Sequence, residues 1–175
     1  VGTRSEAVIL ASLFATLIVV APAVLLAGAS LCARVLTRDG RTVFALAMRY
    51  VYALVPFGFV VWLGQYGFQL LTGVLVVVPI PPATAIDVFG RALLGEPLWR
   101  WAGMRPGAVF PIQVGLLALG TIGSLGVLGV MAADDHPERE VRAMTPWAVL
   151  ILLLFAAGIW VMYQPMEMRG LGIGA

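Results

Sequence analysis

The polar loop at residues 134–140 holds the densest group of candidate metal ligands in the sequence. Asp134, Asp135 and His136 are consecutive, and Glu138 and Glu140 follow them. Carboxylates and imidazoles bind divalent cations, but a zinc site needs a defined geometry and usually a ligand from a second segment. The pattern therefore favours a solvated loop, with His136 kept as a candidate ligand.

Methionines near the C-terminus form a second candidate site. Met166 and Met168 carry soft thioether sulfurs, which suit cuprous copper. Methionine is also a common filler of packed apolar surroundings, and we favour that interpretation. A small metal-handling or transporter-like membrane protein, using both methionines and His136, is kept as an alternative function.

Gln65, Tyr66 and Gln69 place polar groups inside a long apolar segment. The two glutamines are four residues apart, so they lie on one face of a helix. Polar side chains in a membrane helix either serve a functional site or bond to a neighbouring helix, at about 1 kcal/mol or less per bond. We expect a quinone-binding or other polar pocket here, or a structural contact, and favour the contact.

The composition predicts an all-α membrane protein. Hydrophobic residues make up 61% of the 175-residue chain and charged residues only 11%, whereas soluble domains are about 25% charged. A helix needs about 20 apolar residues to cross the hydrocarbon core. The pattern predicts a single membrane domain at 1–175, with transmembrane helices at about 7–35, 43–71, 109–132 and 146–163.

Two further features describe how these helices meet the membrane and each other. A short interfacial amphipathic helix is expected at about 85–104, and four tryptophans are expected at the level of the headgroups: Trp99, Trp101, Trp147 and Trp160. Four glycines at intervals of three residues predict close packing of the third helix against protein: Gly120, Gly123, Gly126 and Gly129.

Arginine positions give the expected orientation. Arg34, Arg38, Arg41 and Arg49 cluster around the turn at 37–42. Cytoplasmic loops carry an excess of basic residues, so we expect this turn inside and both ends of the chain outside. The expected location is the inner (cytoplasmic) membrane of a bacterium, as a multi-pass protein in contact with membrane lipids.

The scarcity of cysteine and histidine narrows the chemistry. Cys32 and His136 are single, so the chain alone has neither the thiolates for an iron–sulfur cluster nor two haem-ligating histidines. The weak positive charge lacks the basic stripe that nucleic-acid binding needs. We expect no enzyme activity, no catalytic residues and no cofactor bound by this chain alone, although a lipid or quinone at its surface is compatible with the pattern.

Two stretches resemble a known family: RYVYALVPFGF at 49–59, continuing to Trp62 and Tyr66, and QPMEMRG at 164–170. They are similar to the membrane portion of bacterial polyferredoxin-type (4Fe-4S ferredoxin-like) membrane proteins. The clustered Cys-x-x-Cys runs of that family are missing, and Gln65 and Gln69 stand where the resemblance implies histidines. The resemblance therefore implies a membrane anchor without the redox clusters.

Together these patterns predict a non-catalytic membrane subunit. It would anchor or stabilise a larger bacterial redox complex by packing against other membrane subunits of a hetero-oligomer. Besides the metal-handling alternative, we keep a second one: an accessory subunit of a photosynthetic or respiratory supercomplex.

Overall fold

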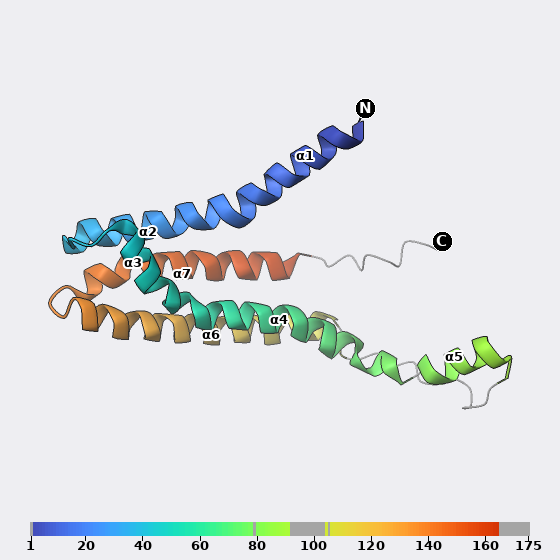
Figure 1. The fold of residues 1–175 in the computed structure, drawn as a ribbon. Helices are drawn as coiled ribbons and strands as arrows, with labels where there is room; N and C mark the ends of the chain where they lie inside the picture. The colour runs from blue at the N-terminus through green and yellow to red at the C-terminus, as the bar shows by residue number, and fades with distance from the viewer. Residues whose placement is uncertain (1, 79, 92–103, 105, 165–175) are drawn as a thin grey trace. The chain divides into compact units, whose positions relative to one another are not determined.

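The structure is a computed structural model that describes residues 2–78, 80–91, 104 and 106–164. These residues form helices and no strands (Figure 1). Four helical segments are long and apolar enough to cross a membrane: Glu6–Thr37, Val43–Gly73, Gly107–Asp135 and Glu140–Tyr163. The predicted all-α class with four candidate transmembrane helices and a shorter additional helix is confirmed.

The first span is a long helix with one irregular turn. It consists of α1 (Gly2–Ala15), the π-helical turn η1 (Thr16–Val20) and α2 (Ala21–Thr37). Pro22 explains the irregularity, because proline lacks the N–H of a regular helical bond and its ring crowds the preceding turn. The wider turn is closed by the N–H of Ala21, which donates to the carbonyl of Thr16.

The second span is also interrupted near a proline. It runs through α3 (Val43–Tyr50), the 3₁₀ turn η2 (Val51–Leu54) and α4 (Val55–Gly73). The turn lies just before Pro56, because proline lacks a backbone donor and its ring crowds the preceding turn. A second 3₁₀ turn, η3 (Val74–Val77), follows α4.

The short helix between the second and third spans differs from its predicted range of 85–104. α5 covers Ile80–Phe89. It starts earlier because Pro81 and Pro82 occupy its first turn, where no N–H is needed. It ends at Gly90, whose φ of 64° is the left-handed conformation typical of a helix end. Trp99 and Trp101 lie outside the described residues.

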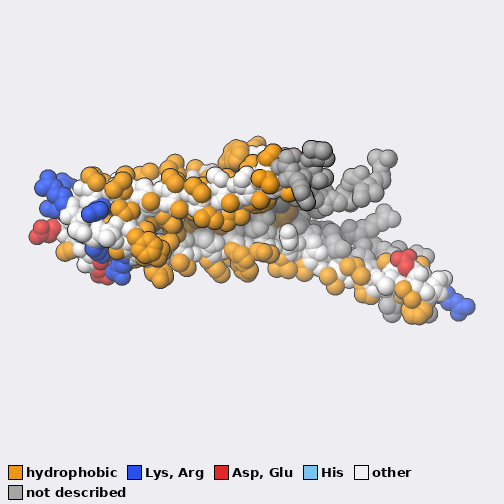
Figure 2. Space-filling view, turned by 45° about the horizontal axis from the view of Figure 1, so that its top comes forward, with side chains coloured by type: hydrophobic (Ala, Val, Ile, Leu, Met, Phe, Trp, Pro, Cys, Tyr) orange, Lys and Arg blue, Asp and Glu red, His pale blue; other side chains and the backbone are white. Residues whose placement is uncertain are grey.

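The last two spans are longer than predicted. α6 covers Pro106–Asp135 and α7 covers Glu140–Tyr163. The chain divides into two compact units: Val1–Phe57 with Thr121–Phe155, and Gly58–Gly120 with Ala156–Ala175. Figure 2 shows hydrophobic side chains covering the helices, while the charged side chains of the first unit gather where its helices end.

The core of the first unit centres on two aromatic residues. Tyr50 and Trp147 are fully buried, and their ring centroids are 5.8 Å apart. Small residues on α2, including Ala29 and Ala33, bring that helix close to this core. Trp147, expected as an interfacial anchor, is buried in this core against Tyr50 of α3, and its depth in a membrane stays a prediction.

The second unit has its own packing. Gln113 of α6 is buried, and its Nε2 donates to the carbonyl of Gly64, 3.1 Å away. Phe110 and Tyr163 meet edge to face, with ring centroids 5.8 Å apart. Trp160, expected as an interfacial anchor, is two-thirds exposed on α7.

Candidate functional site

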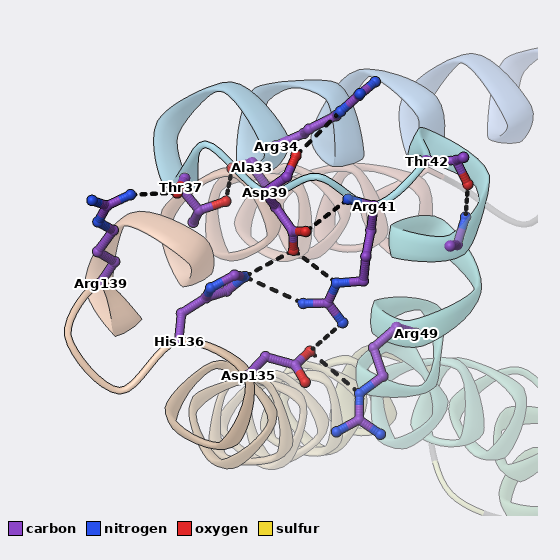
Figure 3. Close-up of polar contacts among 11 residues, drawn as sticks. Ala33, Arg34, Thr37, Asp39, Arg41, Thr42, Arg49, Asp135, His136 and Arg139 are labelled. Carbon is purple, nitrogen blue, oxygen red and sulfur yellow. Dashed lines mark hydrogen bonds and ion pairs between the residues drawn. The ribbon is translucent and has the colours of Figure 1, made fainter.

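A group of charged side chains joins the helix ends of the first unit at one face (Figure 3). We call it the polar cluster, and it consists of Asp39, Arg41, Arg49, Asp135 and His136. Asp39 and Arg41 come from the loop between α2 and α3, Arg49 from α3, and Asp135 and His136 from the end of α6 and the residue after it. The cluster thus joins segments more than 80 residues apart in the sequence.

Local backbone geometry places the first two members. α2 ends where Arg38 takes a left-handed conformation, with φ of 56°. The Asp39 carboxylate then accepts a 2.8 Å hydrogen bond from the backbone N–H of Arg41, which closes a tight turn of the kind that aspartate favours. This turn directs the Arg41 side chain toward α6.

Two carboxylates share the cationic groups of the cluster. Arg41 Nε lies 2.8 Å from Asp39 Oδ2, and its Nη1 lies 3.3 Å from Asp135 Oδ2. Arg49 Nε also approaches Asp135 Oδ2, at 3.4 Å. The Asp39 and Asp135 side chains are only 8% and 14% exposed, whereas those of Arg41 and Arg49 are 37% and 45% exposed, so water screens these ion pairs in part.

His136 is held inside this arrangement. Its Nε2 lies 3.1 Å from Asp39 Oδ2 and 3.3 Å from Arg41 Nη2. Nε2 faces a carboxylate, which can accept a hydrogen from it, and a guanidinium N–H, which can only donate to its lone pair, so the tautomer of His136 decides which of the two contacts is a hydrogen bond. The Arg41 guanidinium next to Nε2 repels cations and opposes metal binding there.

Asp39 and Arg41 shift each other's protonation. Burial raises the pKa of Asp39, but the backbone N–H and the guanidinium of Arg41 outweigh burial and hold the pKa below its ordinary value. Burial alone would lower the pKa of Arg41. The hydrogen bond to Asp39 and the charge of Asp135 outweigh burial, so the pKa of Arg41 lies above its ordinary value. Both groups therefore stay charged at neutral pH.

A further arginine ties the loop before α7 to α2. Arg139 Nη1 donates a 2.7 Å hydrogen bond to the carbonyl of Thr37, one of the helix-end carbonyls that lack an intrahelical partner. The sequence predicted a solvated loop here. The loops at 38–42 and 134–142 carry opposite charges and are expected on the same side of the membrane. Together these two facts could have predicted that the loops contact each other.

The predicted metal sites are not assembled in the described part of the chain. Within it, no three His, Cys, Asp or Glu side chains form a group that could hold a metal ion. His136 is used by the polar cluster, and Met166 and Met168 lie outside the described residues.

The predicted polar pocket on the second span is an exposed surface of α4. Gln65, Tyr66 and Gln69 are exposed, and neither glutamine side chain makes a hydrogen bond within the residues that the structure describes. Tyr66 ends a ladder of rings, with centroid distances of 6.3 Å from Phe59 to Trp62 and 5.0 Å from Trp62 to Tyr66. We call Phe59, Trp62, Gln65, Tyr66 and Gln69 together the aromatic–amide face.

The four glycines of α6 have different surroundings. A Cβ at Gly123 would lie 3.3 Å from Pro56 Cβ, so this glycine permits a close approach of α6 to the start of α4. A Cβ at Gly126 or Gly129 would meet no other atom within 4 Å. Gly120 is buried. Close packing of the kind predicted is therefore seen at Gly123.

Two buried aromatic side chains near the polar cluster have polar atoms without a hydrogen bond. Tyr50 Oη and Trp147 Nε1 are buried without a hydrogen-bond partner at bonding distance among the described residues. Buried polar atoms are nearly always bonded, so this pair is an exception in the core.

The resemblance to polyferredoxin-type proteins stays a prediction, because the chain matches no protein-family model and no curated protein or solved structure is significantly similar to it.

Proposed function

We propose that this chain is a non-catalytic membrane subunit that anchors or stabilises a larger bacterial redox complex in the inner membrane. The observation that carries the proposal is the aromatic–amide face of α4. It combines three large exposed rings with two exposed carboxamides on a helix that is long and apolar enough to cross a membrane. Such a surface is suited to contact with protein rather than with lipid tails.

The carboxamides supply the energetic argument. A polar group without a hydrogen-bond partner in hydrocarbon costs several kcal/mol. Gln65 and Gln69 have no such partner among the described residues, so a polar group on another membrane subunit would stabilise them. The rings of Phe59, Trp62 and Tyr66 provide the adjoining packing surface, because aromatic residues are enriched at interface cores.

The first span supports the same proposal. In the most apolar 18-residue window of Glu6–Thr37, none of the residues is buried by the rest of the chain. Within the first unit, α1 leaves the other helices beyond the π-helical turn (Figure 1). A helix without packing from its own chain is available to a neighbouring subunit.

The redox character of the complex rests on the resemblance described above. The aromatic–amide face adds a compatible chemistry, because amide N–H and phenol O–H groups donate hydrogen bonds to quinone carbonyls. In this proposal a partner subunit supplies the remaining wall of the quinone pocket. The chain shapes the pocket and carries no electrons itself.

Co-purification in a mild detergent tests the proposal. We expect the tagged chain to retain partner subunits in fixed ratio, with haem or iron–sulfur absorption. Trp62→Ala together with Tyr66→Ala should lower this recovery at least about fivefold, the effect of about 1 kcal/mol at the interface. The control is Trp160→Ala, which removes another exposed tryptophan, from α7; Trp160 is 66% exposed and Trp62 is 56% exposed.

Two results would contradict the proposal. One is a chain that purifies alone, at full yield, from membranes in which it is expressed at its natural level. The other is equal loss of partners in the α4 variant and in the Trp160→Ala control, since that result would assign no special role to the aromatic–amide face.

A further inference from the structure

The exposed surface of α3 is divided into an apolar flank and a cationic flank. Leu46 and Tyr50 face the core of the first unit and are buried. Phe44 and Met48 are 70% and 48% exposed, and at 100° per residue they lie only about 40° apart around the helix. Arg49 lies about 100° beyond Met48, on the other flank.

Contacts at both ends of α3 tie this helix to the end of α6. Arg41 precedes α3 by two residues, and Arg49 is in its last turn. Both approach the same atom, Oδ2 of Asp135, at 3.3 and 3.4 Å. Asp135 is the last residue of the third candidate span. A helix directed into the membrane would carry Arg49 about 10 Å deeper than the residue before its first turn, whereas here both arginines share one partner at the end of a span.

The direction of α3 agrees with these contacts. Figure 1 shows α3 running obliquely across the first unit, from the end of α2 toward the start of α4, rather than alongside α2 and α7. The 3₁₀ turn η2 and Pro56 follow it, where the chain changes direction. α4 has 19 residues, which rise about 28 Å, close to a hydrocarbon core of about 30 Å. The second crossing therefore does not need α3.

The divided surface of α3 suits one environment. A cationic flank is costly inside hydrocarbon, and exposed apolar side chains gain nothing in water. At the boundary between headgroups and acyl chains, an amphipathic helix satisfies both flanks. Arg49 remains 45% exposed beside Asp135, so its guanidinium is also open to the phosphates of the headgroups.

We propose that α3 is an interfacial helix, with Phe44 and Met48 among the upper acyl chains and Arg49 at the level of the phosphates. α4 alone then makes the second crossing, which narrows this span from Val43–Gly73 to Val55–Gly73. The partner of the exposed surface of α3 is the lipid of the surrounding bilayer. Because α3 and its contacts lie in the first unit, the inference depends neither on the aromatic–amide face nor on a partner subunit.

Nitroxide labels measure the depth of single positions in a bilayer. The full chain with Cys32→Ala, which removes the single cysteine, is reconstituted into vesicles of phosphatidylcholine and phosphatidylglycerol. One label site is then introduced at a time: Phe44→Cys, Ala45→Cys, Met48→Cys or Leu153→Cys. All four positions are exposed, so the labels should leave the core intact. Accessibility to oxygen relative to a water-soluble nickel chelate gives the depth of each label.

The expected depths follow the flanks of α3. Labels at Phe44 and Met48 should lie at similar depths, about 5–10 Å below the phosphates. The label at Ala45, on the flank of Arg49, should be more accessible to the nickel chelate than its neighbour at Phe44. Leu153 lies midway along α7 and is 60% exposed, so it is the matched deep control and should lie near the centre of the bilayer.

Two results would overturn the proposal. One is a depth difference of about 6 Å between the labels at Phe44 and Met48, which four residues directed along the membrane normal would give. The other is equal depth for the labels at Phe44 and Leu153, since that result would place α3 inside the hydrocarbon core. Both measurements use the isolated chain, so their outcome is separate from whether a redox complex co-purifies with it.

Discussion

At the scale of single residues, Asp135 is the group on which the polar cluster depends most. Its Oδ2 approaches both Arg41 and Arg49. Among the described residues of α6, it is the one that forms an ion pair with each of these arginines. Removing the charge would leave Arg49 without an ion-pair partner among the described residues and Arg41 with Asp39 alone. Both arginines are more than one third exposed, so water offsets part of the loss.

We therefore expect Asp135→Asn to lower the free energy of unfolding by about 1 kcal/mol. Thermal unfolding in detergent, followed by circular dichroism, measures the change. Asp134→Asn is the control, because Asp134 is exposed and makes no ion pair among the described residues. Equal effects of the two substitutions would show that the ion pairs contribute nothing.

The pKa of Asp39 predicts a dependence of stability on pH. Because its pKa in the folded protein lies below the ordinary value, folding favours the charged carboxylate. This contribution is complete above the unfolded pKa of about 3.9 and is lost as the pH falls through the folded pKa. Arg41 stays protonated throughout and adds no change in this range.

Unfolding curves measured between about pH 6 and pH 3 check this sign. The unaltered chain should be more stable than Asp39→Asn at pH 6, and the difference should shrink as the solution is acidified below the unfolded pKa. A difference that grows on acidification would contradict a lowered pKa for Asp39.

At the scale of helices, side chains that end or begin an element have defined roles. Thr42 precedes α3, and its Oγ1 accepts a 3.2 Å hydrogen bond from the backbone N–H of Ala45. This is the N-cap arrangement that satisfies one free N–H of the first turn. α3 carries Arg49 and Tyr50 and thereby places both beside α6 and α7.

We expect Thr42→Ala to destabilise the protein by about 1 kcal/mol, whereas Thr42→Ser should retain most of the stability. Thermal unfolding of the two variants side by side is the measurement. A serine variant as unstable as the alanine variant would show that the methyl group of Thr42, and not its hydroxyl, is what matters.

The sequence predicted the helices better than their limits. Apolar runs of sufficient length predict membrane helices, because a helix bonds its own backbone N–H and C=O groups and hydrocarbon offers them no other partner. Their ends are set by local details, such as prolines in the first turn of α5 and the left-handed Arg38. The short helix α5 therefore covers Ile80–Phe89, and residues 92–103 of the predicted range 85–104 lie outside the described residues.

The burial of Trp147 shows what a sequence pattern does not reveal about packing between helices. A tryptophan near a helix end is typical of the membrane interface, and the sequence gives no sign that the ring of Tyr50 covers it. Contacts between residues almost 100 positions apart depend on how helices pack. The pairing of Arg41 with Asp135 was missed for the same reason, although both loops were expected on one side of the membrane.

At the scale of the whole molecule, much of the chain's apolar surface faces outward. α1 and the aromatic–amide face of α4 contribute large exposed side chains, which lipid or other subunits must cover in a membrane. The carboxamides of Gln65 and Gln69, which have no hydrogen-bond partner among the described residues, distinguish the α4 surface from the mainly apolar surface of α1. In the proposal made above, a protein subunit covers them.

The polar cluster also has a consequence for the order of events during synthesis. Arg41 and Arg49 emerge from the ribosome many residues before Asp135, since synthesis runs from the N-terminus. During that interval Asp39 is the only described partner of Arg41, and Arg49 has none. Once α6 is in place, Asp135 approaches both arginines, and the two carboxylates together balance the two guanidinium charges. In the expected orientation, with this loop in the cytoplasm, the same two arginines would first favour that orientation and later join the helix ends.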